Sequence, residues 1–138
     1  PGRVINLHTS YLPYNRGSSP NFFSFLENTP KGVTIHLMSA GLDEGDILCQ
    51  RELHFDEEKE TFASTYEALL QEIEKLFREN WQQIREGSIL PVKQAGPVTY
   101  HRMKDLDAIR EKVEFDWNMK IGDFKRAYEK AMRKDENS

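Results

Sequence analysis

Three side chains near the start of the sequence could carry out proton chemistry together: the amide of Asn6, the imidazole of His8 and the carboxylate of Asp43. An imidazole titrates near neutral pH and can give or take a proton at modest cost. A neighbouring carboxylate favours its charged form, and an amide N–H can stabilise an oxygen that gains negative charge during a reaction. This set suits attack on a carbonyl group. No convincing nucleophile accompanies it, so we expect direct group transfer rather than a covalent enzyme intermediate.

A short buried strand that ends at His8 is expected to position the first two of these side chains. Alternation along a strand points Asn6 and His8 to the same side. Residues 33–37 alternate between apolar and polar types and predict a second strand. The loop that follows carries Asp43, which we expect at the same edge of the sheet. Asp46 competes for this role, because either carboxylate could reach the site.

The elements around these strands are predicted from apolar runs and turn residues. A third strand is expected over residues 46–53. A helix should begin at Pro20, with Ser19 as its cap and proline at the first helical position. Residues 88–100 contain two prolines and a glycine, so we expect a loop or a short hairpin there.

Three further helices are expected. Apolar residues at three- and four-residue spacing predict a long helix over residues 61–86, with Thr61 as its cap and Gly87 as its stop. Two shorter helices are predicted over residues 105–113 and 121–132. The long helix is expected to cover one face of the sheet.

Composition limits the classes of protein to which the chain can belong. With 138 residues and a net charge of −4, it suits one compact domain and argues against a general nucleic-acid binder. Its single cysteine, Cys49, allows no internal disulfide, which fits a reducing compartment and a cytoplasmic location. No stretch approaches the roughly 20 apolar residues of a membrane helix, so no membrane partner is expected. The four histidines and the cysteine lack ligand spacing, so no metal is expected either.

Four motifs in order along the chain carry a family resemblance: Asn6-Leu7-His8, Ser10-Tyr11-Leu12-Pro13, Gly32-Val33-Thr34-Ile35-His36 and Leu42-Asp43-Glu44-Gly45-Asp46. They resemble the second half of the catalytic domain of folate-dependent formyltransferases. The resemblance implies an α/β fold, the carboxy-terminal half of the formyltransferase fold, with a short, mostly parallel or mixed sheet covered by helices and followed by a helical tail. It assigns residues 1–103 to the catalytic domain, whose amino-terminal half is expected to be missing, and residues 104–138 to the helical tail or a linker.

The resemblance also assigns roles to residues. It implies that Asn6, His8 and Asp43 are the catalytic trio and that 10-formyltetrahydrofolate is the co-substrate. An acceptor amine would attack the formyl carbon, Asn6 and protonated His8 would stabilise the oxyanion, and Asp43 would keep His8 charged. His36 is expected to support the pocket rather than to carry protons. The residues implied to line the folate pocket are Leu37, Met38, Ser39, Ala40, Gly41 and Leu42.

Two further segments narrow the branch of the family. Residues 16–20 (Arg-Gly-Ser-Ser-Pro) and 115–117 (Phe-Asp-Trp) resemble the methionyl-tRNA and nucleotide-linked amino-sugar formyltransferases more than the purine-pathway enzymes. The expected substrate-binding residues are Ser10, Tyr11 and Arg16. Arg16 could equally brace its loop, and Ser10 could hydrogen-bond the turn backbone.

An amino sugar carried on a nucleotide is the favoured acceptor. The turn over residues 11–23 is rich in aromatic and amide side chains, and the acidic balance disfavours tRNA. This small-molecule amine would be the main partner, and a homodimer is allowed. Three alternatives stay open: a methionyl-tRNA formyltransferase, a formyltetrahydrofolate hydrolase, and an inactive fragment or non-catalytic module. Without the other half of the domain, the isolated chain could be inactive.

Overall fold

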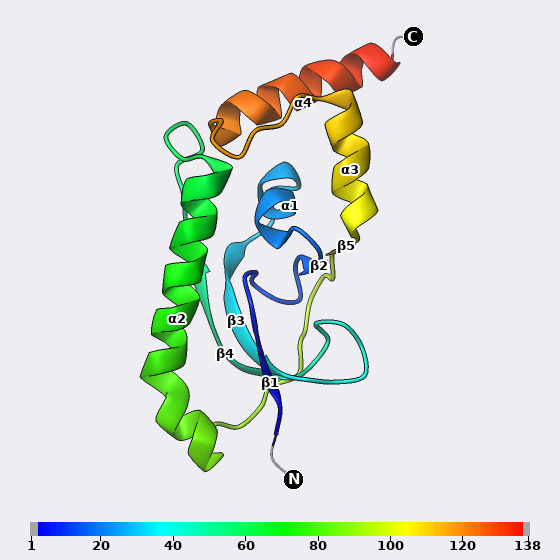
Figure 1. Ribbon diagram of the computed structural model, residues 1–138. Coiled ribbons are helices and arrows are strands. Elements are labelled where there is room, and N and C mark those ends of the chain that lie inside the picture. Colours follow the sequence, from blue (N-terminus) through cyan, green and yellow to red (C-terminus); the bar gives the residue numbers. More distant parts are fainter. Residues whose placement is uncertain (1–2, 137–138) are drawn as a thin grey trace.

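The computed structural model describes residues 3–136, and it has the expected α/β architecture (Figure 1). Two small sheets are combined with four helices in the described part of the chain. The elements, in chain order, are β1 (Ile5–His8), β2 (Arg16–Gly17), α1 (Pro20–Leu26), β3 (Lys31–Leu37), β4 (Ile47–Leu53), α2 (Phe62–Glu86), β5 (Tyr100–His101), α3 (Met103–Lys112) and α4 (Ile121–Glu136).

The larger sheet has the order β1-β3-β4, with antiparallel pairing on both sides of β3. Within residues 3–136, parallel pairing is confined to the short β2 and β5 strands. Across its two sheets the fold is therefore mixed, and fewer of its strands pair in parallel than expected. The physical reason is the connection between β3 and β4, which is a loop, whereas parallel neighbours need a longer crossover.

The antiparallel register changes how the candidate residues meet. His8 pairs with Thr34, whereas Ile5 pairs with Leu37 at the end of β3. The loop after β3 therefore starts beside the beginning of β1, at the end of the strand pair away from His8. This loop swings out from the sheet and folds back (Figure 1), and its return brings Asp43 to His8.

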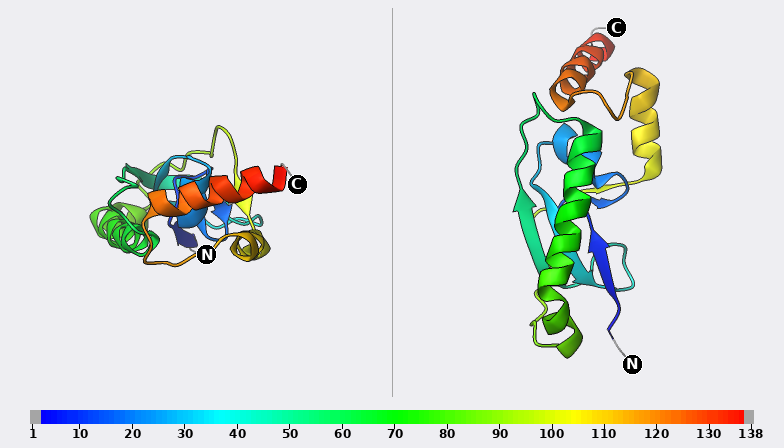
Figure 2. Two further views of the ribbon diagram at one scale, coloured as in Figure 1. Left: turned by 90° about the horizontal axis from the view of Figure 1, so that it is seen from above. Right: turned by 60° about the vertical axis from the view of Figure 1, so that its left-hand side comes forward.

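Helix α2 covers one face of the three-stranded sheet (Figure 2). The Thr61 side chain accepts a hydrogen bond from the Ser64 amide and the helix ends at Gly87 in the left-handed region, so both predicted ends are confirmed. The buried face of the helix packs on the sheet through a cluster of Val33, Ile35, Leu69, Ile73 and Leu76. Burial of this apolar stripe is the main force that holds helix and sheet together.

A second core cluster joins α1 to the carboxy-terminal helices. Phe22 and Phe62 pack against Phe124 of α4, and Leu106 of α3 belongs to the same cluster. Helix α4 crosses the end of the molecule at which α1 lies (Figures 1 and 2). The helical tail is thus packed against the rest of the chain, while a domain boundary between residues 103 and 104 stays a prediction.

The start of α1 differs from the expectation in one respect. Pro20 occupies the first helical position, as predicted, but Ser19 has φ 53° and makes no side-chain cap hydrogen bond. A capping hydroxyl normally extends from β-region backbone toward the first helical amides. Ser19 therefore occupies the predicted N-cap position, but its left-handed backbone does not fit side-chain capping. Separately, no helix within residues 3–136 is both long and apolar enough to span a membrane.

Candidate functional site

His8, at the end of β1, is a buried imidazole with both ring nitrogens near polar partners. Its Nε2–H donates to the backbone carbonyl of Asn15 at 2.8 Å. Because a carbonyl can only accept, this bond places the proton of the neutral ring on Nε2. Nδ1 then carries the lone pair, and it lies 3.6 Å from the Asp43 carboxylate. The ring is therefore oriented with its basic nitrogen toward Asp43.

Asp43 reaches this position from a residue in the left-handed region, with φ 57°. Aspartate tolerates this conformation better than most residues. Its Oδ2 accepts a hydrogen bond from the Gly17 amide at 2.8 Å, and its Oδ1 lies 3.7 Å from Nε2 of His36. Asp46 instead contributes its backbone carbonyl, which accepts from the Leu37 amide. The carboxylate between the two imidazoles is thus that of Asp43.

Asn6 and His36 complete the cluster on neighbouring strands, where they face each other in the register. The Nδ1–H of His36 donates to the Leu37 carbonyl at 3.0 Å, so Nε2 of its neutral ring can accept from the Asn6 amide, 3.3 Å away. Protonation would turn that Nε2 into a donor toward Asp43 and release one Asn6 hydrogen. The Asn6 amide carries two hydrogens, so one of them stays available in either state.

The three titratable groups have different pKa shifts. Burial lowers the pKa of His8 below 6.5, and the Asn15 hydrogen bond and the Asp43 charge offset this only in part. Burial also opposes the charged form of His36, but its contacts with Asp43 and the Leu37 carbonyl outweigh this and raise its pKa. For Asp43, His36 and the Gly17 amide outweigh the cost of burial and lower the pKa. The lowered pKa favours the neutral form of His8 at pH 7, in contrast to the expectation that Asp43 keeps it charged.

Arg16 and Gln94 connect the Asp43 loop to the segment after α2. Gln94 donates from Nε2 to the carbonyls of Asp43 and Gly45, both at 2.8 Å. Its Oε1 accepts from Nε and Nη2 of Arg16, whose Nη1 lies 3.8 Å from Glu44. Arg16 thus braces its loop, which was one of the two roles that the sequence left open for it. Sequence reasoning missed Gln94, because a lone glutamine in a loop gives no signal of a contact so distant in the chain.

The other predicted binding residues divide into two groups. The Ser10 hydroxyl donates to the Tyr14 carbonyl, and the Ser10 carbonyl accepts from the Thr34 hydroxyl, so Ser10 holds the turn. Tyr11 is half-buried in the same turn. The segment predicted to bind folate is open instead: Met38 is 54% and Leu42 is 59% exposed, Ser39 and Ala40 are exposed, and Leu37 and Gly41 are half-buried.

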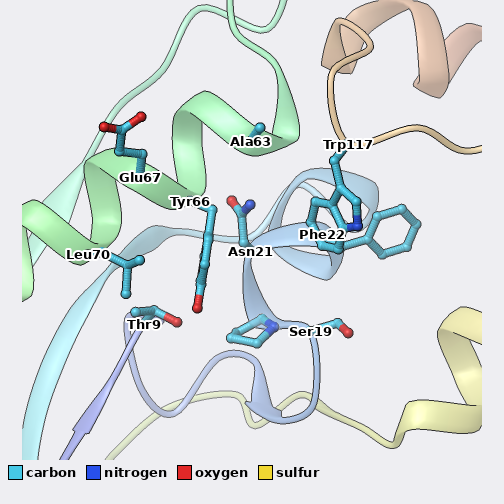
Figure 3. A pocket seen from close by; sticks show the side chains of 10 residues that line it. Thr9, Ser19, Asn21, Phe22, Ala63, Tyr66, Glu67, Leu70 and Trp117 are labelled. Carbon is cyan, nitrogen blue, oxygen red and sulfur yellow. The ribbon is translucent and has the colours of Figure 1, made fainter.

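A cavity of about 560 Å³ is lined by Thr9, by the start of α1 and by α2 (Figure 3). It lies between the start of α1 and the first turns of α2. Its lining is mainly apolar and includes Phe22, Tyr66, Leu70 and Trp117. Among residues 3–136, no group of three or more histidine, cysteine, aspartate or glutamate side chains could hold a metal ion.

Comparison with known proteins gives a consistent picture. A family model described as formyl transferase matches residues 1–80. A dTDP-4-amino-4,6-dideoxyglucose formyltransferase of Mycobacterium bovis is 34% identical over 108 residues, which cover 78% of this chain and 46% of that protein. A methionyl-tRNA formyltransferase of Clostridium botulinum is 34% identical over 114 residues, covering 82% of this chain and 35% of that protein.

Among solved structures, the chain resembles a formyltransferase, PseJ, of Anoxybacillus kamchatkensis in complex with UDP-4,6-dideoxy-4-formamido-L-AltNAc and tetrahydrofolate. The TM-score is 0.80 and the sequence identity 47%, over 86% of this chain and 62% of that one. A sugar N-formyltransferase from Shewanella is similar with a TM-score of 0.73 and 27% identity, over 85% of this chain and 46% of that one. The chain thus spans about half the length of the curated sugar formyltransferase that it matches.

Proposed function

Because the formyl transferase model matches more than half of its length, this chain belongs to the formyl transferase family, and we propose that it transfers a formyl group from 10-formyltetrahydrofolate to the amine of a nucleotide-linked amino sugar. The observation that carries the proposal is the buried contact between His8 and Asp43, with Asn6 on the same strand. Such a cluster combines a base, a charge that stabilises the protonated base and a hydrogen-bond donor for an oxyanion.

Neutral His8 acts as the base in the proposed reaction. The amine nitrogen attacks the formyl carbon, and Nδ1 of His8 takes the proton that the nitrogen loses. Asp43 stabilises the imidazolium that forms, because its carboxylate lies 3.6 Å from that nitrogen. The proton then passes to N10 of the folate as the bond from N10 to the formyl carbon breaks. The products are the N-formylated amino sugar and tetrahydrofolate, and no charge is left on the protein.

Asn6 stabilises the oxygen that becomes negative in the tetrahedral intermediate. One Asn6 hydrogen lies toward His36 and the other is free for that oxygen. Removing one such donor from a preorganised site typically costs about 2.7–4 kcal/mol of transition-state stabilisation. Nε2 of His36 accepts from this amide when the ring is neutral and donates toward Asp43 when the ring is charged, so we assign His36 a positioning role.

The donor is proposed to bind along residues 37–42. Met38 and Leu42 expose apolar side chains there, which suits the aromatic rings of a folate. The choice of a folate as donor, though not its place along the chain, is supported by the tetrahydrofolate in the Anoxybacillus crystal. The acceptor assignment is supported by the amino-sugar nucleotides named for the relatives. A tRNA acceptor is the second candidate, since a methionyl-tRNA formyltransferase is equally identical over its matched part.

Formyl transfer to UDP- and dTDP-linked amino sugars tests the proposal, with product detected by mass spectrometry. We expect His8→Ala and Asp43→Asn each to cut turnover by roughly 100-fold or more, with unchanged circular dichroism. Asp46→Asn is the matched control and should keep most of the activity. Near-normal turnover in both site variants would contradict the mechanism. Formate release that needs no amine would identify a hydrolase instead.

A further inference from the structure

The spacing between His8 and Asp43 is not set by a hydrogen bond between the two side chains. Nδ1 of His8 lies 3.6 Å from Oδ1 of Asp43, which is too long for an ordinary N–H···O bond. Each group is instead fixed by its own bond to the turn after β1. His8 donates to the Asn15 carbonyl and Asp43 accepts from the Gly17 amide, both at 2.8 Å. The turn over residues 15–17 therefore sets the distance between the base and the carboxylate.

Asn15, the first residue of this turn, has a conformation that asparagine adopts at a cost. Its φ is 59°, in the left-handed region, which glycine enters freely and other residues only rarely. The residue is 1% exposed, and its Oδ1 has no hydrogen-bond partner within the part of the chain that the structure describes. A buried polar atom without a partner also costs stability. Such residues persist where the surrounding structure holds them, and they cluster at active sites.

Two threonines from distant parts of the chain hold Asn15 in this conformation. Nδ2 of Asn15 donates to the Thr29 hydroxyl at 2.8 Å, and its backbone N–H donates to the Thr99 hydroxyl at 2.6 Å. The Thr99 carbonyl also accepts from the Arg16 amide, and the Thr99 amide donates to the Pro13 carbonyl. The side chain and the backbone of Asn15 are thus fixed separately, and its carbonyl keeps one direction.

The side chain of Asn15 supplies something that glycine would lack at this position. Glycine would adopt the left-handed backbone without strain, and it would remove the unpaired Oδ1. It would also remove the bond to the Thr29 hydroxyl and increase the conformational freedom of the turn. The turn could still take its shape, but its carbonyl would be directed less tightly. The asparagine side chain therefore contributes order at the carbonyl.

The direction of the Asn15 carbonyl matters for the proposed reaction. A neutral imidazole carries its proton on either ring nitrogen, and only the form with the proton on Nε2 offers Nδ1 of His8 as a base beside Asp43. If the carbonyl turned away, both forms would be populated and the fraction of productive protein would fall. A group that orients a histidine in this way controls its reactivity without touching the substrate.

We propose that Asn15 is a positioning residue for the transfer reaction, with Thr29 and Thr99 as the groups that hold it. Its carbonyl selects the tautomer of His8, and the turn that it fixes carries the amide that holds Asp43. This inference rests on the proposed function and adds to it a residue that acts through the base.

The tautomer of His8 provides a test that needs no turnover. In ¹⁵N-labelled protein, at a pH where the ring is neutral, the shifts of the two ring nitrogens show which of them carries the proton. We expect His8 to be mainly in the Nε2–H form, and we expect Asn15→Gly and Thr99→Val each to produce a mixture of both forms. Thr99→Ser keeps the hydroxyl and should restore the native ratio. An unchanged ratio in both Asn15→Gly and Thr99→Val would overturn the proposal, as would a native His8 that is mainly in the Nδ1–H form.

Kinetics separate positioning of the base from binding of a substrate. Asn15→Gly and Thr99→Val should each lower kcat by roughly 10- to 100-fold, the effect of a small misplacement of a reacting group, and leave the KM of both substrates unchanged. Thr99→Ser should again be close to native. Asn28→Gly is the matched control, because Asn28 is also left-handed, with φ 56°, but is exposed and bonded to Lys125.

Three outcomes decide between this role and the alternatives. A raised KM with unchanged kcat would overturn the proposal, since the turn would then hold a substrate rather than the base. Lower stability of Asn15→Gly and Thr99→Val, with native kcat and a native tautomer ratio, would overturn it as well, because Asn15 would then be merely structural. A changed tautomer ratio in a protein that transfers no formyl group would support the action of Asn15 on His8 and refute the proposed function.

Discussion

The Nε2–H of His8 donates to the backbone carbonyl of Asn15 at 2.8 Å, and this bond fixes which ring nitrogen faces Asp43. The carbonyl cannot act as a donor, so it holds the Nε2–H tautomer of the neutral ring. Any proton that His8 gains must therefore enter at Nδ1, beside the carboxylate. The turn after β1 thus sets the direction of proton transfer.

The pKa shifts predict the order in which the buried histidines titrate. Burial lowers the pKa of His8 below 6.5, and the contacts with Asp43 and the Leu37 carbonyl raise that of His36 above 6.5 despite its burial. NMR titration of the ring carbons should show His36 losing its proton at a higher pH than His8. Because the mechanism needs neutral His8, turnover should fall only when the pH drops below 6.5. The reverse order, or an acidic limb above pH 6.5, would contradict this assignment.

Gln94 is predicted to hold the Asp43 loop. Gln94→Leu removes the two hydrogen bonds that it donates to the carbonyls of Asp43 and Gly45 and the two that its Oε1 accepts from Arg16. At about 0.5–1.5 kcal/mol for each bond, the free energy of unfolding should fall by about 2–6 kcal/mol. Hydrogen exchange at the Gly17 amide, which is bonded to Asp43, should become faster.

A matched substitution on α2 controls for the loss of a glutamine. Gln71 is exposed, and its contact with Glu67 is long, at 3.5 Å. Gln71→Leu should therefore change the unfolding free energy by less than about 0.5 kcal/mol. Equal effects of the Gln94 and Gln71 substitutions in urea unfolding would show that Gln94 does not support the loop.

Much of the fold follows from patterns along the sequence. The long helix, its cap at Thr61 and its end at Gly87 were predicted because local capping chemistry and apolar spacing decide them. The left-handed backbone of Ser19 was not predicted. The residue before it, Ser18, donates its backbone N–H to the His101 carbonyl. A pairing between residues so far apart in the chain leaves no local pattern in the sequence.

The site shows the same division between local and distant contacts. Alternation along β1 predicts that Asn6 and His8 share a side. In the structure His8 contacts Asp43 directly, whereas Asn6 is linked to Asp43 through His36. The sequence could not supply the sign of the His8 pKa shift, because burial depends on the packing of the whole turn. The antiparallel register was also unpredicted, since the pattern of a short buried strand does not specify its direction.

Gly45 is predicted to be essential for the return of the Asp43 loop. A Cβ at this position would collide with the backbone carbonyl of Leu37. Gly45→Ala should therefore displace the loop, lower the unfolding free energy by about 1–3 kcal/mol and weaken the contact of Asp43 with His36. Gly41→Ala is the control, since its Cβ would meet only the flexible side chain of Glu44. Thermal unfolding of both variants checks the prediction, and equal losses of stability would contradict it.

Phe124 is predicted to stabilise the whole molecule, although it lies in the helical tail. Its ring contacts those of Phe22, Phe62 and Phe115, and its side chain is fully buried. Phe124→Ala should lower the unfolding free energy by about 3–5 kcal/mol, measured in guanidinium by circular dichroism. Met103→Ala, at a position 74% exposed, should cost less than about 0.5 kcal/mol.

The same variant tests how far the tail supports the candidate sites. Phe22 lies both in the Phe124 cluster and beneath the cavity, so removal of the Phe124 ring should loosen the cavity wall as well. Hydrogen exchange should then become faster in α1 and at the start of α2, whereas the end of α2, which packs on the sheet, should change less. If residues 104–138 were an independent linker, Phe124→Ala would leave exchange in α1 unchanged. Uniform exchange across α2 would show instead that both core clusters unfold as one unit.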